Sequence, residues 1–171
     1  MRTRKSNRLE NFDYSQNGMY FVTICTKGRE ELFGEIIDGK IILNELGIIV
    51  LKNLQEIPNY FENIFLDRYI IMPNHLHLIV EINKSIVGAV HEPPLQKRRN
   101  MLIPKIIGKF KMLSAKEINI LTKNSGNPLW QRNYYDHIIR NEISLNKIRE
   151  YILTNPGRWE RDRNNAENIL M

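Results

Sequence analysis

The stretch 64–82 constrains the fold of this chain more than any other part of the sequence. It is rich in Ile, Val, Leu and Tyr, which favour strands, and Pro73 interrupts it. Proline cannot donate the backbone hydrogen bond that a central strand requires. We therefore expect strands over 64–72 and 75–82, or one long strand bent near Pro73.

Two other segments also have strand character. Residues 20–26 form a run of β-branched and aromatic residues, as in a buried strand. Residues 33–43 predict a hairpin that turns at Asp38-Gly39, a dipeptide that accepts positive φ.

Apolar residues at helical spacing predict three helices: one over 44–56 with Asn44 as its N-cap, one that begins near Pro104, and one over 144–154. The segment 130–140 is aromatic and mixed, and it predicts neither element. Several strands, two or three helices and no alternating strand–helix repeat indicate an α+β fold with an antiparallel sheet.

The composition is that of a single domain with peripheral segments. The chain has 171 residues, of which 42% are hydrophobic, and 25 basic against 19 acidic residues give a net charge of +6. We expect a basic arm over 1–11, a surface loop over 83–100 and a peripheral polar tail over 160–171. The lone Cys25 excludes an internal disulfide framework, and without a signal peptide or a long apolar span we expect a cytoplasmic, nucleoid-associated protein with no membrane partner.

His75-Leu76-His77 is the triplet with the clearest chemical meaning. Alternate side chains of a strand share one face, so both imidazoles project together while Leu76 points into the opposite layer. Two imidazoles at that spacing can hold one divalent ion, although both can equally be structural histidines.

Tyr151 and Asn155 lie four residues apart at the end of a predicted helix and can share a face. A tyrosine hydroxyl beside a metal-bound phosphate can act as a nucleophile, and an asparagine oxygen can complete the metal site. Tyr134 and Tyr135 are rival nucleophiles, and Tyr151 and Asn155 can also be an ordinary core aromatic and a helix-ending residue.

Several basic residues are candidate contacts for a nucleic-acid backbone. They are Arg98, Arg99, Lys105, Lys109, Arg132, His137 and Arg140. Trp130, Tyr134 and Tyr135 can stack on bases or serve as buried anchors. No phosphate-binding loop, dinucleotide fingerprint or serine-hydrolase elbow is present in the sequence.

Three motifs in order resemble those of the REP-associated tyrosine transposases, a branch of the single-tyrosine transposases. The first is Met72-Pro-Asn-His-Leu-His-Leu78, and the second is the run 130–142. The third, 148–156, is similar to their helix with the catalytic tyrosine, and the opening strand over 20–26 fits as well.

This resemblance implies a ferredoxin-like or RRM-like antiparallel sheet backed by helices. It implies Mg²⁺ or Mn²⁺ on His75, His77 and Asn155, with Tyr151 as the nucleophile, although insertion-sequence relatives have Gln at the Asn155 position. It also implies cleavage of single-stranded or hairpin DNA through a 5′-phosphotyrosine link, followed by rejoining, in a monomer or a homodimer. The alternatives are a non-catalytic nucleic-acid-binding module of the same fold and a metal-dependent hydrolase of small phosphoesters.

Overall fold

A computed structural model describes residues 12–84, 101–124, 126–162 and 164–165 of the chain. The expected arm over 1–11 and most of the expected loop over 83–100 lie outside these residues. The elements, in chain order, are β1 (Gly18–Cys25), η1 (Lys27–Arg29), β2 (Gly34–Ile37), β3 (Lys40–Leu43), α1 (Glu45–Gln55), α2 (Ile57–Tyr60), β4 (Ile64–Met72), β5 (His75–Ile82), α3 (Leu102–Leu121), β6 (Tyr135–Ile139), α4 (Glu142–Thr154) and η3 (Pro156–Arg161).

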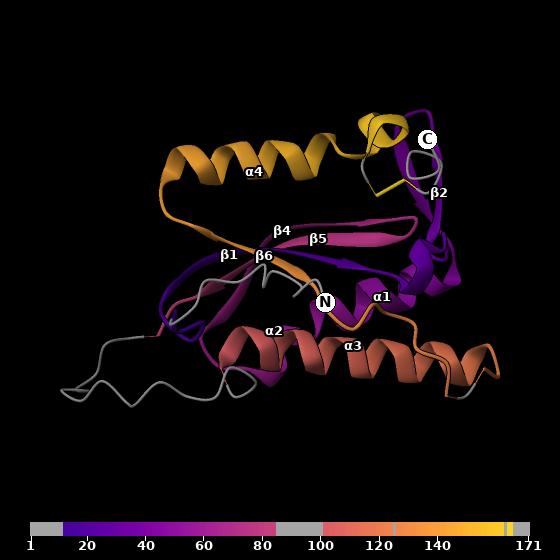
Figure 1. Ribbon diagram of the computed structural model, residues 1–171, viewed down its shortest axis with the longest axis horizontal. Coiled ribbons are helices and arrows are strands. Elements are labelled where there is room, and N and C mark those ends of the chain that lie inside the picture. Colours follow the sequence, from indigo (N-terminus) through magenta and orange to yellow (C-terminus); the bar gives the residue numbers. More distant parts are fainter. Residues whose placement is uncertain (1–11, 85–100, 125, 163, 166–171) are drawn as a thin grey trace, which may run out of the picture.

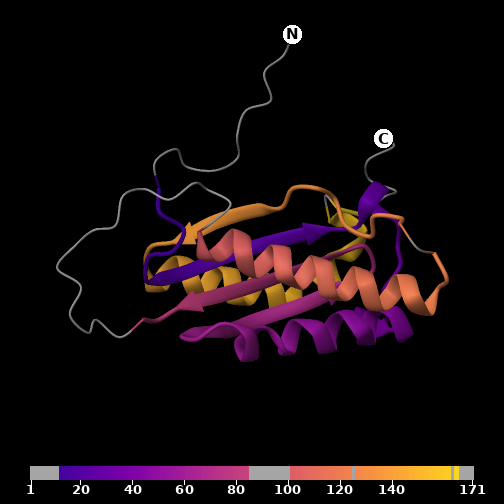
Figure 2. The same ribbon diagram turned by 90° about the horizontal axis from the view of Figure 1, so that it is seen from below.

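The main sheet has the strand order β4-β5-β1-β6, and all neighbours are antiparallel. With the β2–β3 hairpin as an insertion, the chain follows the β-α-β-β-α-β order of ferredoxin-like folds. Helices α1, α2 and α3 lie below the sheet in Figure 1 and α4 lies above it; Figure 2 shows α1 and α3 in front of the sheet with α4 behind. The predicted α+β fold with an antiparallel sheet backed by helices is confirmed.

The segment 64–82 forms two strands rather than one bent strand. β4 and β5 begin and end where their β-branched runs predict, and Met72 pairs with His75 across the Pro73-Asn74 turn. Because proline has no N–H to donate, a turn is the position where it removes nothing from the ladder. The antiparallel pair that results brings the residues after the turn to one end of the sheet.

The local signals at 33–56 also predict the structure correctly. β2 and β3 pair antiparallel, and both Asp38 (φ 50°) and Gly39 (φ 70°) have the positive φ that a tight hairpin turn requires. The Asn44 side chain accepts a hydrogen bond from the Gly47 N–H and caps α1.

Most of the core lies between the sheet and the α1–α3 layer. Tyr20, Val22 and Ile24 of β1 alternate into it, as do Leu76, Leu78 and Val80 of β5. A smaller apolar cluster lies on the α4 face, where Ile79 and Ile139 meet Leu145 and Ile152. One side of each central strand therefore provides the packing, and the other side is available for polar groups.

Two features differ from the sequence-based expectations. Residues 135–139 form the edge strand β6, paired with β1, where no element was predicted. The end of the chain is not a peripheral tail throughout, because Asp162, Asn164 and Asn165 are buried. Hydrogen bonds compensate much of this burial, as when the Asn164 N–H donates to Asp162 Oδ1 and Asn165 Nδ2 donates to the Trp159 backbone oxygen.

Candidate functional site

His75 and His77 share one face of β5, as their spacing predicts, and both are fully buried. Their Nε2 atoms lie 3.0 Å apart. Leu76 between them enters the opposite, apolar layer. Two imidazole nitrogens at this separation share either one proton or one cation.

The far nitrogen of each ring is anchored by a neighbour. His75 Nδ1 lies 2.8 Å from Asn74 Oδ1, and the Asn74 Nδ2 group donates to the backbone oxygens of Arg29 and Asn164. Since the amide nitrogen of Asn74 is used in this way, its Oδ1 must accept from His75 Nδ1–H. The Nε2 atom of a neutral His75 consequently presents a lone pair to the site, which is the arrangement typical of a metal-ligating histidine.

His77 is held in a similar manner by β1. Its Nδ1 lies 2.8 Å from Thr23 Oγ1, and these two residues are direct partners in the β1–β5 ladder. Phe21 of the same strand stacks on the imidazole at 5.3 Å between centroids. Trp159 of η3 stacks on His75 at 6.0 Å. Aromatic rings therefore flank the histidine pair on two sides.

Helix α4 brings Tyr151 over the histidines. The tyrosine Oη lies 3.2 Å from His77 Nε2, and the two rings meet edge to face. The predicted meeting of two strand imidazoles with a phenol from a distant helix is thus present in the structure, within a single chain.

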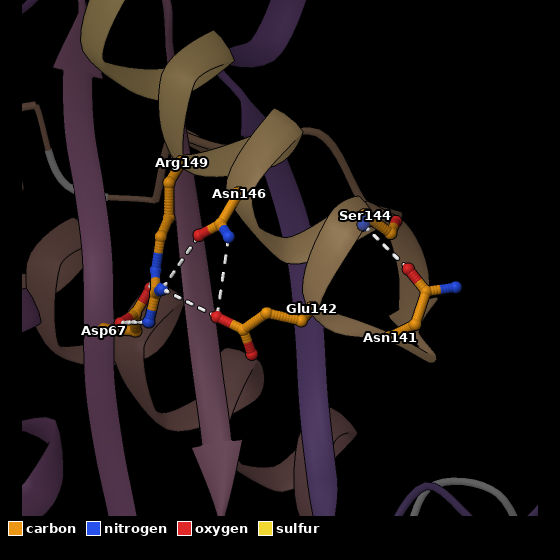
Figure 3. Close-up of polar contacts among 6 residues, drawn as sticks. All are labelled: Asp67, Asn141, Glu142, Ser144, Asn146 and Arg149. Carbon is orange, nitrogen blue, oxygen red and sulfur yellow. Dashed lines mark hydrogen bonds and ion pairs between the residues drawn. The ribbon is translucent and has the colours of Figure 1, made fainter.

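An ion pair fixes α4 to the strand beneath it (Figure 3). Arg149 donates from Nε and Nη2 to the two carboxylate oxygens of Asp67 on β4, at 2.8 and 2.6 Å. Hydrogen bonding to Asp67 raises the pKa of the Arg149 guanidinium. Asn141 caps the N-terminus of α4, where its side chain accepts a hydrogen bond from the Ser144 N–H. The Arg149–Asp67 pair therefore holds α4, the helix that carries Tyr151, against β4.

Asp162 supplies an oxygen atom next to the histidines, and Asn155 contacts Asp162. His75, His77 and Asp162 each offer a ligand atom within 4.8 Å of the others. Asn155 donates from Nδ2 to Asp162 Oδ2 at 2.8 Å, and its Oδ1 is buried with no hydrogen-bond partner among the described residues. A buried acceptor without a partner, on a residue bonded to a carboxylate that lies close to two imidazoles, is a feature that a cation would satisfy.

The spacing of these donors suits a small divalent ion. Ligand atoms bound at ~2.1 Å in neighbouring octahedral positions lie ~3 Å apart, which is the His75–His77 separation. Asn155 was expected from the sequence and Asp162 was not, because a polar residue near the end of the chain is typical of a surface position. The residues present therefore fit a divalent metal, with Asp162 as an additional candidate ligand.

Tyr151 borders an open pocket of about 760 Å³, which Phe21, Asn155 and Asp162 also line. Two exposed arginines of η3, Arg158 and Arg161, line it as well. Neither arginine forms an ion pair within the described part of the chain. The pocket thus combines the phenol with two guanidinium groups against one carboxylate, and this excess of positive charge suits an anionic substrate.

The predicted DNA-binding residues fall into separate groups. His137 of β6 is exposed on the same sheet face as the histidine pair, directly opposite Phe21 in the ladder, and it borders a second pocket together with Arg140. Arg132 is exposed between α3 and β6. Lys105 and Lys109 belong to α3, which covers the other face of the sheet, and the structure does not bring them to this site. Arg98 and Arg99 lie outside the described residues.

The aromatic candidates separate in the same way. Trp130 is a buried anchor, since its Nε1 donates to Ser114 Oγ and its ring packs on Phe33 and Phe110. Tyr134 packs against the core on the α3 side. Tyr135 is 44% exposed and pairs with Thr23, so it lies on the site face in the same row as His77. Of the three, Tyr135 alone is both exposed and near the site.

Five residues of the candidate site were not expected from the sequence: Asn74, Asp162, Arg158, Arg161 and Phe21. Asn74 lies within the quoted motif around Pro73, and its position just before the first histidine was the available signal. The other four carry no local signal, because their roles depend on contacts with β5 and α4. None of the described helices has the length and apolar character needed to cross a membrane.

Comparisons with known proteins find relatives of this chain by sequence. No protein-family model matches the chain. An uncharacterised protein of Haemophilus influenzae is 43% identical over 168 residues, covering 93% of this chain and 91% of that protein. A second protein of that organism, named provisionally as a REP-associated tyrosine transposase, is 26% identical over 145 residues, covering 84% of this chain and 73% of its own length.

A solved structure provides the comparison of folds. The structure of a REP-associated tyrosine transposase bound to a REP hairpin matches with a TM-score of 0.59 at 13% identity, over 91% of this chain and 74% of the other. At that identity the match shows that the fold is shared. The four-stranded sheet and its helices are therefore those of a known transposase architecture.

Proposed function

Since this chain belongs to one family with the uncharacterised Haemophilus influenzae protein and resembles REP-associated tyrosine transposases in sequence and fold, we propose that it is a transposase-type enzyme. Its activity is metal-dependent cleavage and rejoining of single-stranded DNA. One observation carries this proposal: the Tyr151 hydroxyl lies 3.2 Å from His77 Nε2, which lies 3.0 Å from His75 Nε2, beside an open pocket with two arginines.

The first step is an attack by Tyr151 Oη on the phosphorus of a DNA phosphodiester. The tyrosine O–P bond forms, and the P–O3′ bond breaks. The phenol loses its proton, and the departing 3′ oxygen gains one. The products are a 5′-phosphotyrosine and a free 3′-hydroxyl.

Rejoining reverses the chemistry with a new strand. A 3′-hydroxyl attacks the phosphotyrosine, a P–O3′ bond forms, and the tyrosine O–P bond breaks. The phenol is restored with its proton. Each step exchanges one phosphoester for another, so the covalent intermediate retains the bond energy and no external source is required.

His75 and His77 would hold the Mg²⁺ or Mn²⁺ ion, with the third ligand drawn from Asn155 Oδ1 or the Asp162 carboxylate. When bound, the ion polarises a phosphoryl oxygen and offsets negative charge. Asn74 and Thr23 hold the two imidazoles in place, and the Arg149–Asp67 pair holds α4, which carries Tyr151, on the sheet.

The proposed partner is hairpin-forming, single-stranded DNA. The related solved transposase is bound to a REP hairpin, and this chain exposes His137 on the sheet face of the histidine pair, with Arg140 at the same second pocket. The proposed nucleophile and the proposed ligands come from one chain, so a single copy contains the complete set of groups.

The test uses 3′-labelled single-stranded hairpin DNA with manganese, with or without chelator, on a denaturing gel. We expect the wild type to carry the 3′ label in a covalent adduct that chelator prevents and that Tyr151→Phe abolishes. The matched control is Tyr135→Phe, which removes a hydroxyl from the same sheet face and should retain the adduct.

Other outcomes assign other functions. Loss of the adduct in Tyr135→Phe, with retention in Tyr151→Phe, moves the nucleophile to Tyr135. Metal-dependent hydrolysis that persists in Tyr151→Phe without an adduct indicates a phosphoesterase. DNA binding with neither adduct nor cleavage, and with no metal requirement, indicates a non-catalytic binding module.

A further inference from the structure

Helix α4 covers one half of its sheet face, including Ile139 at the end of β6, and leaves the half around Tyr135 and His137 open. It packs on Ile79 of β5 and reaches β4 through the Arg149–Asp67 pair. On β6, beyond β1, Tyr135 remains 44% exposed and His137 is exposed. The open half begins directly beside the proposed nucleophile.

Three rings line this open half in a defined register. Phe21 of β1 is directly opposite His137, and Thr23 is directly opposite Tyr135. Directly opposed side chains of an antiparallel pair have Cβ atoms about 5 Å apart, so Phe21 and His137 are adjacent, and Tyr135 lies two residues from His137 on the same face. Phe21 connects them to the site, because its ring stacks on His77 and meets Tyr151 edge to face at 6.1 Å.

Positive charge lies along the pocket that Phe21 and Tyr151 share. Arg158 and Arg161 are exposed there and have no carboxylate partner within the residues that the structure describes. An aromatic surface beside a cationic border is the combination by which proteins hold single-stranded nucleic acid, since bases stack and phosphates remain charged. A double helix keeps its bases stacked on one another and cannot use such a surface.

We propose that the nucleotides next to the attacked phosphate lie across the open half of the sheet. Their bases stack on Tyr135 and His137, with Phe21 at the edge of the site, and their phosphates face Arg158 and Arg161. The statement that this path leads to Tyr151 rests on the proposed function. Binding of a single strand to the surface can be measured without cleavage.

The binding test keeps cleavage out of the measurement. Fluorescence anisotropy in chelator compares a labelled oligothymidine with an abasic strand of equal length and charge. The wild type should prefer the strand with bases, and Tyr135→Ala and His137→Ala should each weaken that binding by about five- to tenfold while leaving the abasic strand unaffected.

Two control variants separate stacking from general effects. Tyr135→Phe keeps the ring and should bind as the wild type does. Tyr60→Ala removes a tyrosine of similar exposure (49%) from α2, on the opposite layer, and should also change nothing. Because Tyr135 and His137 are exposed, thermal denaturation should show all four variants folded.

The arginines are tested by salt dependence. Arg158→Gln and Arg161→Gln should weaken binding of the base-bearing and abasic strands alike, and each should lower the slope of log affinity against log salt by about one. A slope equal to that of the wild type would remove the arginines from the path.

Equal binding of the base-bearing and abasic strands by the wild type, or wild-type binding by both alanine variants, overturns the proposed path. If the adduct assay still shows a Tyr151-dependent product in that case, the proposed function stands without it. The two alanine variants could instead lose base-dependent binding while the wild type forms no adduct. In that case the surface binds single strands, and the enzymatic proposal fails.

Discussion

Strand β5 sends Leu76 and Leu78 into the layer beneath α1 and α3, and His75 and His77 into the layer beneath α4. The first layer contains most of the buried apolar side chains, whereas the second has a small apolar cluster and the histidine site. Alternation of side chains along β5 alone therefore supplies both the apolar core and the histidine site. Stability and chemistry are separated across the thickness of one sheet.

Two tyrosines illustrate the difference. Tyr20 of β1 lies on the core side, its hydroxyl donates to the Gln16 backbone oxygen, and burial raises its pKa. Tyr151 lies on the other side, at a pocket open to solvent and 3.2 Å from an imidazole. The same side chain is thus a packing residue in one layer and a candidate nucleophile in the other.

Neighbouring substitutions give the largest effect and the most direct test of this separation. Leu76→Ala removes a fully buried side chain and should lower the free energy of unfolding by about 2–5 kcal/mol, measured by chemical denaturation. The folded fraction should still be stabilised by Mn²⁺. His77→Ala should abolish that Mn²⁺-dependent rise in melting temperature, because a ligand is missing. A rise that persists in His77→Ala would place the ion elsewhere.

The Arg149–Asp67 pair gives an intermediate effect. Asp67→Asn keeps the size of the side chain but loses the charged, two-fold contact, and we expect a moderate fall in stability in chemical denaturation. Because α4 is then less firmly placed, the rate of adduct formation should fall by about tenfold. Glu142→Gln is the control, since its carboxylate lies 3.9 Å from the guanidinium. An unchanged adduct rate in Asp67→Asn would make the pair purely structural.

The two helix caps give the smallest effect and a matched comparison. Asn44→Ala and Asn141→Ala each remove a side-chain acceptor from a helix N-terminus and should each cost about 1 kcal/mol of stability. Only Asn141→Ala should also slow adduct formation, because α4 and not α1 carries Tyr151. Serine at either position should restore the cap. Equal slowing by both alanine variants would show that the layers are not independent.

Local patterns were sufficient to predict much of the fold. Proline placement and β-branched runs predicted the limits of β4 and β5, and Asp38-Gly39 and Asn44 predicted a turn and a cap. β6 was missed because Tyr135-Asp136-His137 carries no clear alternation. That segment becomes a strand through pairing with the edge of β1, a contact with residues far away in the sequence.

The site was predictable to the extent that it depends on spacing within one element. The histidine pair follows from strand alternation, and the approach of Tyr151 agrees with the resemblance. Asp162 was unpredictable because its burial depends on Asn155 and Asn164, which satisfy its carboxylate in three dimensions. Polar residues of this kind are indistinguishable from surface residues until their partners are known.

The order in which the site is assembled along the chain has a consequence for biosynthesis. Thr23 and His77 are 54 residues apart, whereas His77 and Tyr151 are 74 apart, and Asn74 meets Asn164 across 90 residues. A chain emerging from the ribosome therefore contains the four strands of the main sheet and both imidazoles before α4 has been made. Under the proposed mechanism, the nascent protein cannot attack DNA until that helix has been translated and has docked.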